Sequence, residues 1–212
     1  MRHKTLSFIL LWAYLLLISI SYGHASSVRQ VTIDEMLQQC QFVFEGTVLT
    51  LEAEENSQKR IHTYVTFAIQ DIIKGEYSSD TITLSFLGGT VGDVTMGVSD
   101  MKVPQVGERG IYFVESLERS QVHPLYGWSQ GHFIVKTDET GVDRIMTSNE
   151  QPVTEVAKDM SVEQMNSRRE TVLVLSSGVA KGVTLALKDN DNKGLMVEEF
   201  KNILREKMGM GQ

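Results

Sequence analysis

The strict alternation of side chains between residues 61 and 70 constrains the fold of this chain more than any other feature of its sequence. Successive side chains of a β-strand point to opposite faces of the sheet, so a period of two over this length predicts a strand with one face in the core. The inward set is Ile61, Thr63, Val65, Phe67 and Ile69. Residues 81–87 repeat the pattern, with Ile82, Leu84 and Phe86 as the apolar set.

Four further segments have strand character. Residues 42–51 are rich in aromatic and β-branched side chains, and residues 111–114 are apolar on both faces, which is typical of a central strand. Residues 131–136 and 142–147 indicate a hairpin that is joined through a polar turn. About six strands with short turns predict a barrel or a sandwich.

The connections between the strands also carry signals. Residues 52–59 form a charged stretch that predicts a turn, and the glycine-rich segment 88–97 predicts a loop or a twisted ribbon. Glycines of this kind could also cradle a ligand. The segment lacks the GxxxxGK[ST] phosphate pattern, however, so an inter-strand connection is the simpler interpretation.

Helices are expected at both ends of this β region. Thr32 and Glu35 have the spacing of a capping box, and the apolar residues behind them predict a short amphipathic helix over residues 32–40. Residues 195–208 carry one apolar stripe and predict a second helix. Between them, residues 150–194 indicate part helix and part linker, with a further capping-box spacing at residues 161–164.

Together these signals predict a mainly β (α+β) protein. We expect an OB-like small β-barrel in residues 26–149, with a short N-terminal helix. Residues 150–212 are expected to form a linker and a helical C-terminal extension.

The N-terminal residues have the three parts of an export signal. Arg2 and Lys4 form a positive start, residues 6–20 are almost wholly apolar, and Gly23 and Ala25 give a small-x-small exit. The alternative is an uncleaved membrane anchor, but a spanning helix needs about 20 apolar residues and this core is shorter. We therefore expect residues 1–25 to be a signal peptide cleaved after Ala25, no stable membrane anchor, and a periplasmic or secreted protein.

Charge and cysteine content narrow the classes of partner. The chain has a net charge of −7, and removing the leader with Arg2 and Lys4 leaves about −9. An acidic chain without a basic cluster argues against nucleic acid as a partner.

Cys40 is the single cysteine, so no intrachain disulfide can form. It could be a reactive thiol, but it falls on the apolar face of the first predicted helix and is expected to be buried.

The middle of the chain resembles an uncharacterised domain of exported bacterial proteins, and more distantly the OB-type barrel of the netrin-like and tissue metalloproteinase inhibitor group. The resemblance covers about residues 40–136. It rests on strand and turn signatures, which are Phe44-Glu45-Gly46-Thr47-Val48, Thr63-Tyr64-Val65-Thr66-Phe67, Ile73-Lys74-Gly75, Leu87-Gly88-Gly89, Val106-Gly107-Glu108-Arg109 and Gly131-His132-Phe133. In the inhibitor group an N-terminal cysteine chelates the protease zinc. Here the expected mature chain starts at Ser26, so the resemblance implies the fold and not that route of inhibition.

An aromatic cluster is the first candidate binding site. Tyr126, Trp128, His132 and Phe133 lie within eight residues, and aromatic platforms on OB-type folds bind sugars, peptides or strands. The same residues could equally belong to the core.

Metal sites are the second class of candidate. Asp189, Asp191 and Glu199 resemble the start of a calcium loop, but the twelfth position is Phe200 where the loop requires glutamate. A polar turn before the last helix explains the same residues, so no cofactor is expected, with calcium as the alternative. Of the histidines, His62 and His132 could converge if their strands form a barrel.

These observations favour a non-enzymatic exported binding or interaction module, with another exported protein or an envelope component as partner. The alternatives are a hydrolase with dispersed carboxylates or histidines and a calcium-responsive exported protein. No HExxH or GxSxG motif is present.

Overall fold

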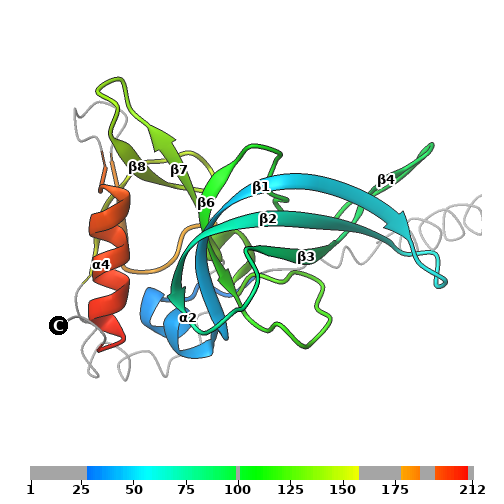
Figure 1. Ribbon diagram of the computed structural model, residues 1–212, viewed down its shortest axis with the longest axis horizontal. Coiled ribbons are helices and arrows are strands. Elements are labelled where there is room, and N and C mark those ends of the chain that lie inside the picture. The colour runs from blue at the N-terminus through cyan, green and yellow to red at the C-terminus, as the bar shows by residue number, and fades with distance from the viewer. Residues whose placement is uncertain (1–27, 99–100, 158–177, 187–193, 210–212) are drawn as a thin grey trace, which may run out of the picture.

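The fold is described from a computed structural model. Its largest element is a six-stranded antiparallel sheet in the order β3-β2-β1-β6-β7-β8 (Figure 1). The structure describes residues 28–98, 101–157, 178–186 and 194–209. The strands of this sheet are β1 (Phe42–Glu55), β2 (Ile61–Lys74), β3 (Thr81–Leu87), β6 (Arg109–Val114), β7 (His132–Thr137) and β8 (Asp143–Thr147). The mainly β fold predicted from the alternation is confirmed.

Two helices and two small strand pairs complete the described fold. The helices are α2 (Ile33–Gln39) and α4 (Val197–Lys207), and η1 (Trp128–Gly131) is a short 3-10 turn. The strand pairs are β4 (Gly89–Val91) with β5 (Val94–Met96), and β9 (Val153–Val156) with β10 (Val183–Leu185). Both predicted terminal helices are thus confirmed. Thr32 caps α2 by accepting a hydrogen bond from the Glu35 amide, as the capping box predicts.

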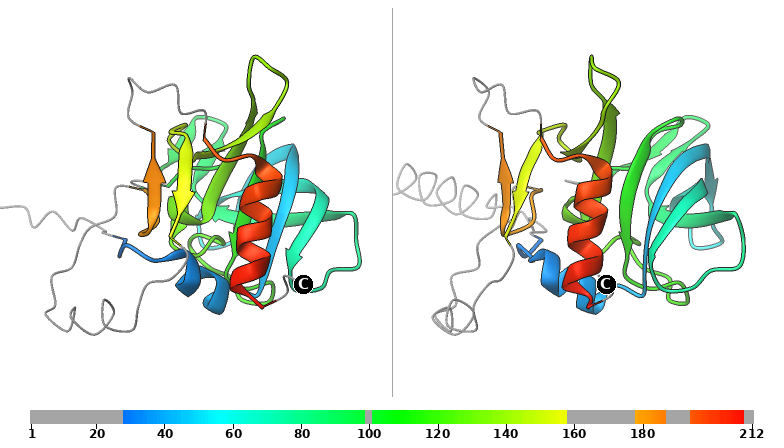
Figure 2. Two further views of the ribbon diagram at one scale, coloured as in Figure 1. Left: turned by 90° about the vertical axis from the view of Figure 1, so that its left-hand side faces the viewer. Right: turned by 60° about the vertical axis from the view of Figure 1, so that its left-hand side comes forward.

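The main sheet is buried on both faces, because neighbouring residues of each strand enter different cores. One core lies beneath α2, α4 and the β9–β10 pair, which cover the same face of the sheet (Figure 2). Val43, Phe113 and Phe133 point into it from the strands, and Phe200 points into it from α4. The opposite core is more aromatic and contains Phe42, Phe44, Phe67, Phe86 and Tyr112.

The sheet bends strongly but does not close. β1 has register shifts against β2 at three points, between Val43 and Phe44, between Glu45 and Gly46, and between Val48 and Thr50. Bulges of this kind increase the local twist, and Figure 1 shows β1 and β2 as two long curved strands. The sheet order ends at β3 and β8, so these strands form its two edges.

Two local predictions differ from the structure. Residues 52–55 continue β1 instead of starting the charged turn, and the turn is confined to residues 56–60. Charged side chains are tolerated there because the last residues of β1 are mostly exposed. The second difference is the β9–β10 pair, which lies in the segment predicted as helix and linker.

Other predictions agree. The segment 88–97 forms the β4–β5 ribbon, the β7–β8 hairpin has its turn at residues 138–142, and Cys40 is buried. The expected leader and the capping-box spacing at 161–164 lie outside the described residues. Among the helices that are described, none has the length and apolar character needed to span a bilayer.

Candidate functional site

The β7–β8 hairpin separates from β6 partway along their shared edge. The ladder between β6 and β7 contains three residue pairs and ends at Gly110 opposite Ile134. β7 nevertheless continues to Thr137 in its pairing with β8, while β6 continues to Arg109 in its pairing with β1. Figure 1 shows the β7–β8 hairpin rising away from the rest of the sheet.

A hollow of about 390 Å³ lies where the two strands separate, and we call it the β6–β7 cleft. Its lining combines charged side chains with two strand residues of low exposure. The lining residues are Gly107, Glu108, Arg109, Ile134, Val135, Lys136, Thr137 and Glu150. The cleft therefore combines charged and hydrogen-bonding groups with apolar surface.

Glu108 is held from inside the protein by His132 and Tyr112. The His132 Nε2 atom lies 2.6 Å from Glu108 Oε1, and the Tyr112 hydroxyl donates to the same oxygen at 3.2 Å. The His132 side chain is 2% exposed and the Glu108 side chain 16% exposed. Burial and the Glu108 carboxylate raise the pKa of the Tyr112 phenol far above its usual value, so the hydroxyl keeps its proton and acts as a donor.

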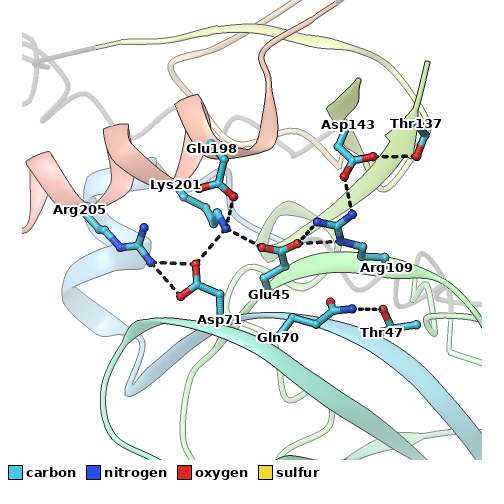
Figure 3. Close-up of polar contacts among 10 residues, drawn as sticks. All are labelled: Glu45, Thr47, Gln70, Asp71, Arg109, Thr137, Asp143, Glu198, Lys201 and Arg205. Carbon is cyan, nitrogen blue, oxygen red and sulfur yellow. Dashed lines mark hydrogen bonds and ion pairs between the residues drawn. The ribbon is translucent and has the colours of Figure 1, made fainter. Parts of the chain in front are cut away.

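Arg109 connects the cleft to a second network, on the other face of the sheet (Figure 3). Its Nε donates to Glu45 Oε1 at 2.7 Å, and its Nη1 donates to Asp143 Oδ2 at 2.5 Å. Partial burial lowers the pKa of Arg109, but the hydrogen bonds to Asp143 and Glu45 outweigh it and raise the pKa overall. Hydrogen bonds from Thr137 and then Arg109 lower the pKa of Asp143. Arg109 is therefore positively charged and is already paired with two carboxylates.

The same network ties α4 to the sheet. Lys201 donates to Glu45 at 2.8 Å and to Asp71 at 2.9 Å, and Arg205 donates to both Asp71 oxygens at 2.9 Å. Burial lowers the pKa of Lys201, but its bonds to Glu198, Glu45 and Asp71 raise it overall. The Glu45 side chain is 2% exposed and that of Lys201 is 6% exposed. Because a buried charge is costly unless it is paired, these residues position the helix as well as stabilise it.

A second hollow, of about 400 Å³, lies beside the C-terminal end of α2. Lys74 lines it and donates to the backbone carbonyl groups of Leu37 and Cys40 at 2.5 and 2.6 Å. Asp34 and Lys207 form an ion pair at 2.9 Å on its other side. These contacts satisfy the carbonyl groups at the helix end, so a structural role explains the polar residues of this hollow.

The structure does not bring the four predicted aromatic-site residues together on one surface. Phe133 packs in the core beneath α4, with its ring 5.0 Å from that of Phe200. His132, the preceding strand residue, points to the opposite face and stacks on Tyr112. Tyr126 donates to Glu35 at 2.8 Å, and Trp128 stacks on His123 with ring centroids 5.5 Å apart.

The histidines also have different neighbours from those expected. His62 contacts Ser85 on the partly exposed face of β2 and β3, whereas His132 contacts Glu108 in the interior. His123 is buried, and burial lowers the pKa of its imidazole to about 3. In the described part of the chain, no three His, Cys, Asp or Glu side chains are grouped as metal ligands.

Of the calcium candidates, Asp189 and Asp191 lie outside the described residues. Glu199 is an exposed residue in the first turn of α4, where a carboxylate favours the positive end of the helix dipole. Calcium binding therefore stays a prediction.

Sequence reasoning identified His132 but missed Glu108, Arg109 and Lys136 as site residues. In the sequence, Glu108 and Arg109 belong to a turn signature before a strand. The one available signal was that two charged residues directly precede an apolar strand, which placed them at its end.

Comparison of the chain with protein-family models, with curated proteins and with solved structures found no match.

Proposed function

We propose that this protein is an exported, non-enzymatic binding module, with the β6–β7 cleft as its binding site. Its partner would be another exported protein or a component of the cell envelope. The observation that carries the proposal is the fixed position of Glu108 and Arg109 at the cleft, each held by two neighbouring side chains. Binding groups that are held before the partner arrives lose little entropy on association.

The charge pattern supports binding over hydrolysis. A hydrolase with two carboxylates would use Glu108 and Glu150, which both line the cleft. Glu150 is mostly exposed and forms an ion pair with Lys136 at 2.6 Å, which lowers the pKa of Glu150. A general acid needs the opposite shift, since its carboxyl must hold a proton near neutral pH. Glu150 therefore lacks the environment of the general acid in such a pair.

We further propose that the sheet is an open form of the OB-type barrel. The order β3-β2-β1-β6-β7 is that of a five-stranded barrel, and its closure would need β3 to pair with β7 at the edge that β8 now occupies. The bulges that bend β1 are the usual device for turning a strand between two sides of such a barrel. Export itself is proposed from the positive, apolar and small-residue parts of the first 25 residues.

The proposal is tested by crosslinking capture with the purified mature chain, applied to periplasm and to culture medium. Lys136→Trp fills the cleft from an exposed strand position, and Thr83→Trp makes the same change at an exposed position of edge strand β3. We expect specific partners with the unmodified chain and with Thr83→Trp, and their loss with Lys136→Trp. Capture that is equal for all three proteins, or that returns nothing specific, contradicts the proposal.

A further inference from the structure

We infer that the β6–β7 cleft binds the primary ammonium group of a lysine side chain on a polypeptide partner, with Glu108 as the group that receives it. This inference rests on the proposed binding function and names the chemistry of the same site. It follows from the hydrogen bonds of Glu108, from the protonation pattern of His132 and from the charges that surround the cleft.

Glu108 has unused capacity to accept hydrogen bonds. His132 and Tyr112 both bond to its Oε1 atom, and within the described residues no hydrogen bond reaches Oε2. A carboxylate has about four lone-pair positions, so this side chain keeps unused acceptor capacity at a place that lines the cleft. The group is largely buried, and its bonds to the two rings fix its orientation.

The contact with His132 leaves Glu108 with its negative charge. The buried Nδ1 atom of His132 has no hydrogen-bond partner in the described residues. An imidazolium would place an N–H donor there without an acceptor, whereas the neutral ring with its proton on Nε2 leaves only a lone pair. The geometry therefore favours a neutral His132, which donates to Glu108 without neutralising its negative charge.

The cations that line the cleft are already paired with other carboxylates. Arg109 is bound to Glu45 and Asp143, and Lys136 is paired with Glu150. Within the described residues, Glu108 is therefore the lining carboxylate that has no Lys or Arg partner. Its uncompensated negative charge favours a cationic ligand, and the negative charge of the whole chain acts in the same direction.

The single available oxygen of Glu108 favours an ammonium group over a guanidinium group. A guanidinium binds a carboxylate best through two parallel hydrogen bonds that use both oxygens. Since Oε1 of Glu108 already accepts from His132 and Tyr112, one oxygen remains for a ligand. A compact ammonium group satisfies a single oxygen well, so lysine fits this site better than arginine.

The test is a titration of the mature chain with Nα-acetyl-lysine methylamide, in which binding is measured by the changes in backbone amide NMR shifts. The probes for comparison are the Nε-acetylated derivative, which has no charge, the corresponding arginine derivative, and cadaverine as a free amine. We expect the lysine probe to shift the signals of Glu108, Arg109, Lys136 and Thr137 at millimolar concentration. Little shift with the acetylated probe and weaker shifts with the arginine probe are also expected. Binding of cadaverine alone would overturn the assignment to a polypeptide lysine.

Variants at the cleft complete the test. Glu108→Gln keeps an oxygen that can accept from His132 and Tyr112 but removes the charge, and we expect at least a tenfold loss of affinity for the lysine probe. Glu115→Gln is the matched control outside the cleft and should bind normally. Lys136→Gln should bind more tightly, because it removes a like charge. Equal binding by Glu108→Gln and the unmodified chain overturns the inference.

The two proposals can fail separately. If Lys136→Trp abolishes capture of a partner but Glu108→Gln does not, the cleft is the binding site and the ammonium inference is wrong. If Lys136→Trp leaves capture unchanged, the proposed function at this cleft is wrong, whatever the small probes do.

Discussion

The Lys201 ammonium group lies 2.8 Å from a carboxylate oxygen of Glu45, although 156 positions separate the two residues in the chain. Both side chains are buried, and Glu45 also accepts from Arg109. The last described helix is therefore attached to the central strand by charge as well as by the packing of Phe200 and Leu204. This attachment makes the stability of the fold sensitive to single changes and to pH.

Replacing Lys201 with methionine should destabilise the protein strongly. The change keeps the side-chain volume but leaves Glu45 and Asp71 with one cation fewer, and breaking a buried pair costs about 3 kcal/mol. Urea unfolding measures the loss as a lower midpoint. Lys59→Met is the matched control, since Lys59 is exposed and its pair with Glu55 is expected to contribute little to stability.

The Glu45→Gln, Lys201→Met double variant should be more stable than the sum of the two single changes predicts, because it removes both charges of the pair. Additive losses would show that the two residues act independently, contrary to the geometry.

The ion pairs of Asp71 should stabilise the protein at neutral pH and be lost in acid. Burial raises the pKa of its carboxyl, but the bonds from Lys201 and Arg205 outweigh burial and lower the pKa overall. A lowered folded-state pKa means that this contribution is complete above the unfolded pKa of about 4 and is lost as the pH falls below it. Urea midpoints from pH 7 to pH 2.5 should show Asp71→Asn less stable at pH 7, with the difference shrinking in acid. A constant difference across this range would exclude the mechanism.

His123 should add a separate pH dependence at higher pH. Its folded-state pKa of about 3 lies below the ordinary value of 6.5, so the unfolded chain binds one more proton between these values. Stability then falls as the pH drops below about 6.5, by up to about 1.4 kcal/mol per pH unit. His123→Asn keeps an acceptor for the Leu125 amide and should flatten the urea midpoints between pH 6.5 and pH 4. Histidine NMR signals that titrate near pH 6 at this residue would contradict the prediction.

Cys40 should be unreactive in the folded protein. Burial raises the pKa of its thiol to about 12, so very little thiolate exists at pH 8. Ellman's reagent at pH 8 should label the native chain at least about 100-fold more slowly than the chain unfolded in guanidinium. Fast labelling of the native protein would mean that the C-terminal end of α2 opens readily.

The parts of the fold that depend on local pattern could be predicted from the sequence. β2 and β3 follow from the alternation of their side chains, and α2 follows from the spacing of Thr32 and Glu35. The β9–β10 pair could not be predicted, because its strands of four and three residues are too short to show a period. Its stability comes from packing on the core beneath α4 instead.

The site was harder to predict for a different reason. His132 and Phe133 were grouped as one aromatic patch, but adjacent strand residues point to opposite faces, so the alternation rule itself separates them. From the sequence alone, Glu45 would be expected on the surface, because glutamate is rarely buried unless it is paired. Those partners come from β6 and α4, and no local pattern indicates a pairing over such a separation.

The position of Lys201 near the end of the chain has a consequence for synthesis. A ribosome that has reached residue 190 has produced every strand of the six-stranded sheet, yet Glu45 and Asp71 still lack the lysine that joins them. Phe200 and Leu204, which cover the core on that face, are also missing at this stage. A nascent chain therefore cannot complete its interior before α4 has been translated, and products truncated ahead of this helix are expected to be substrates for proteases.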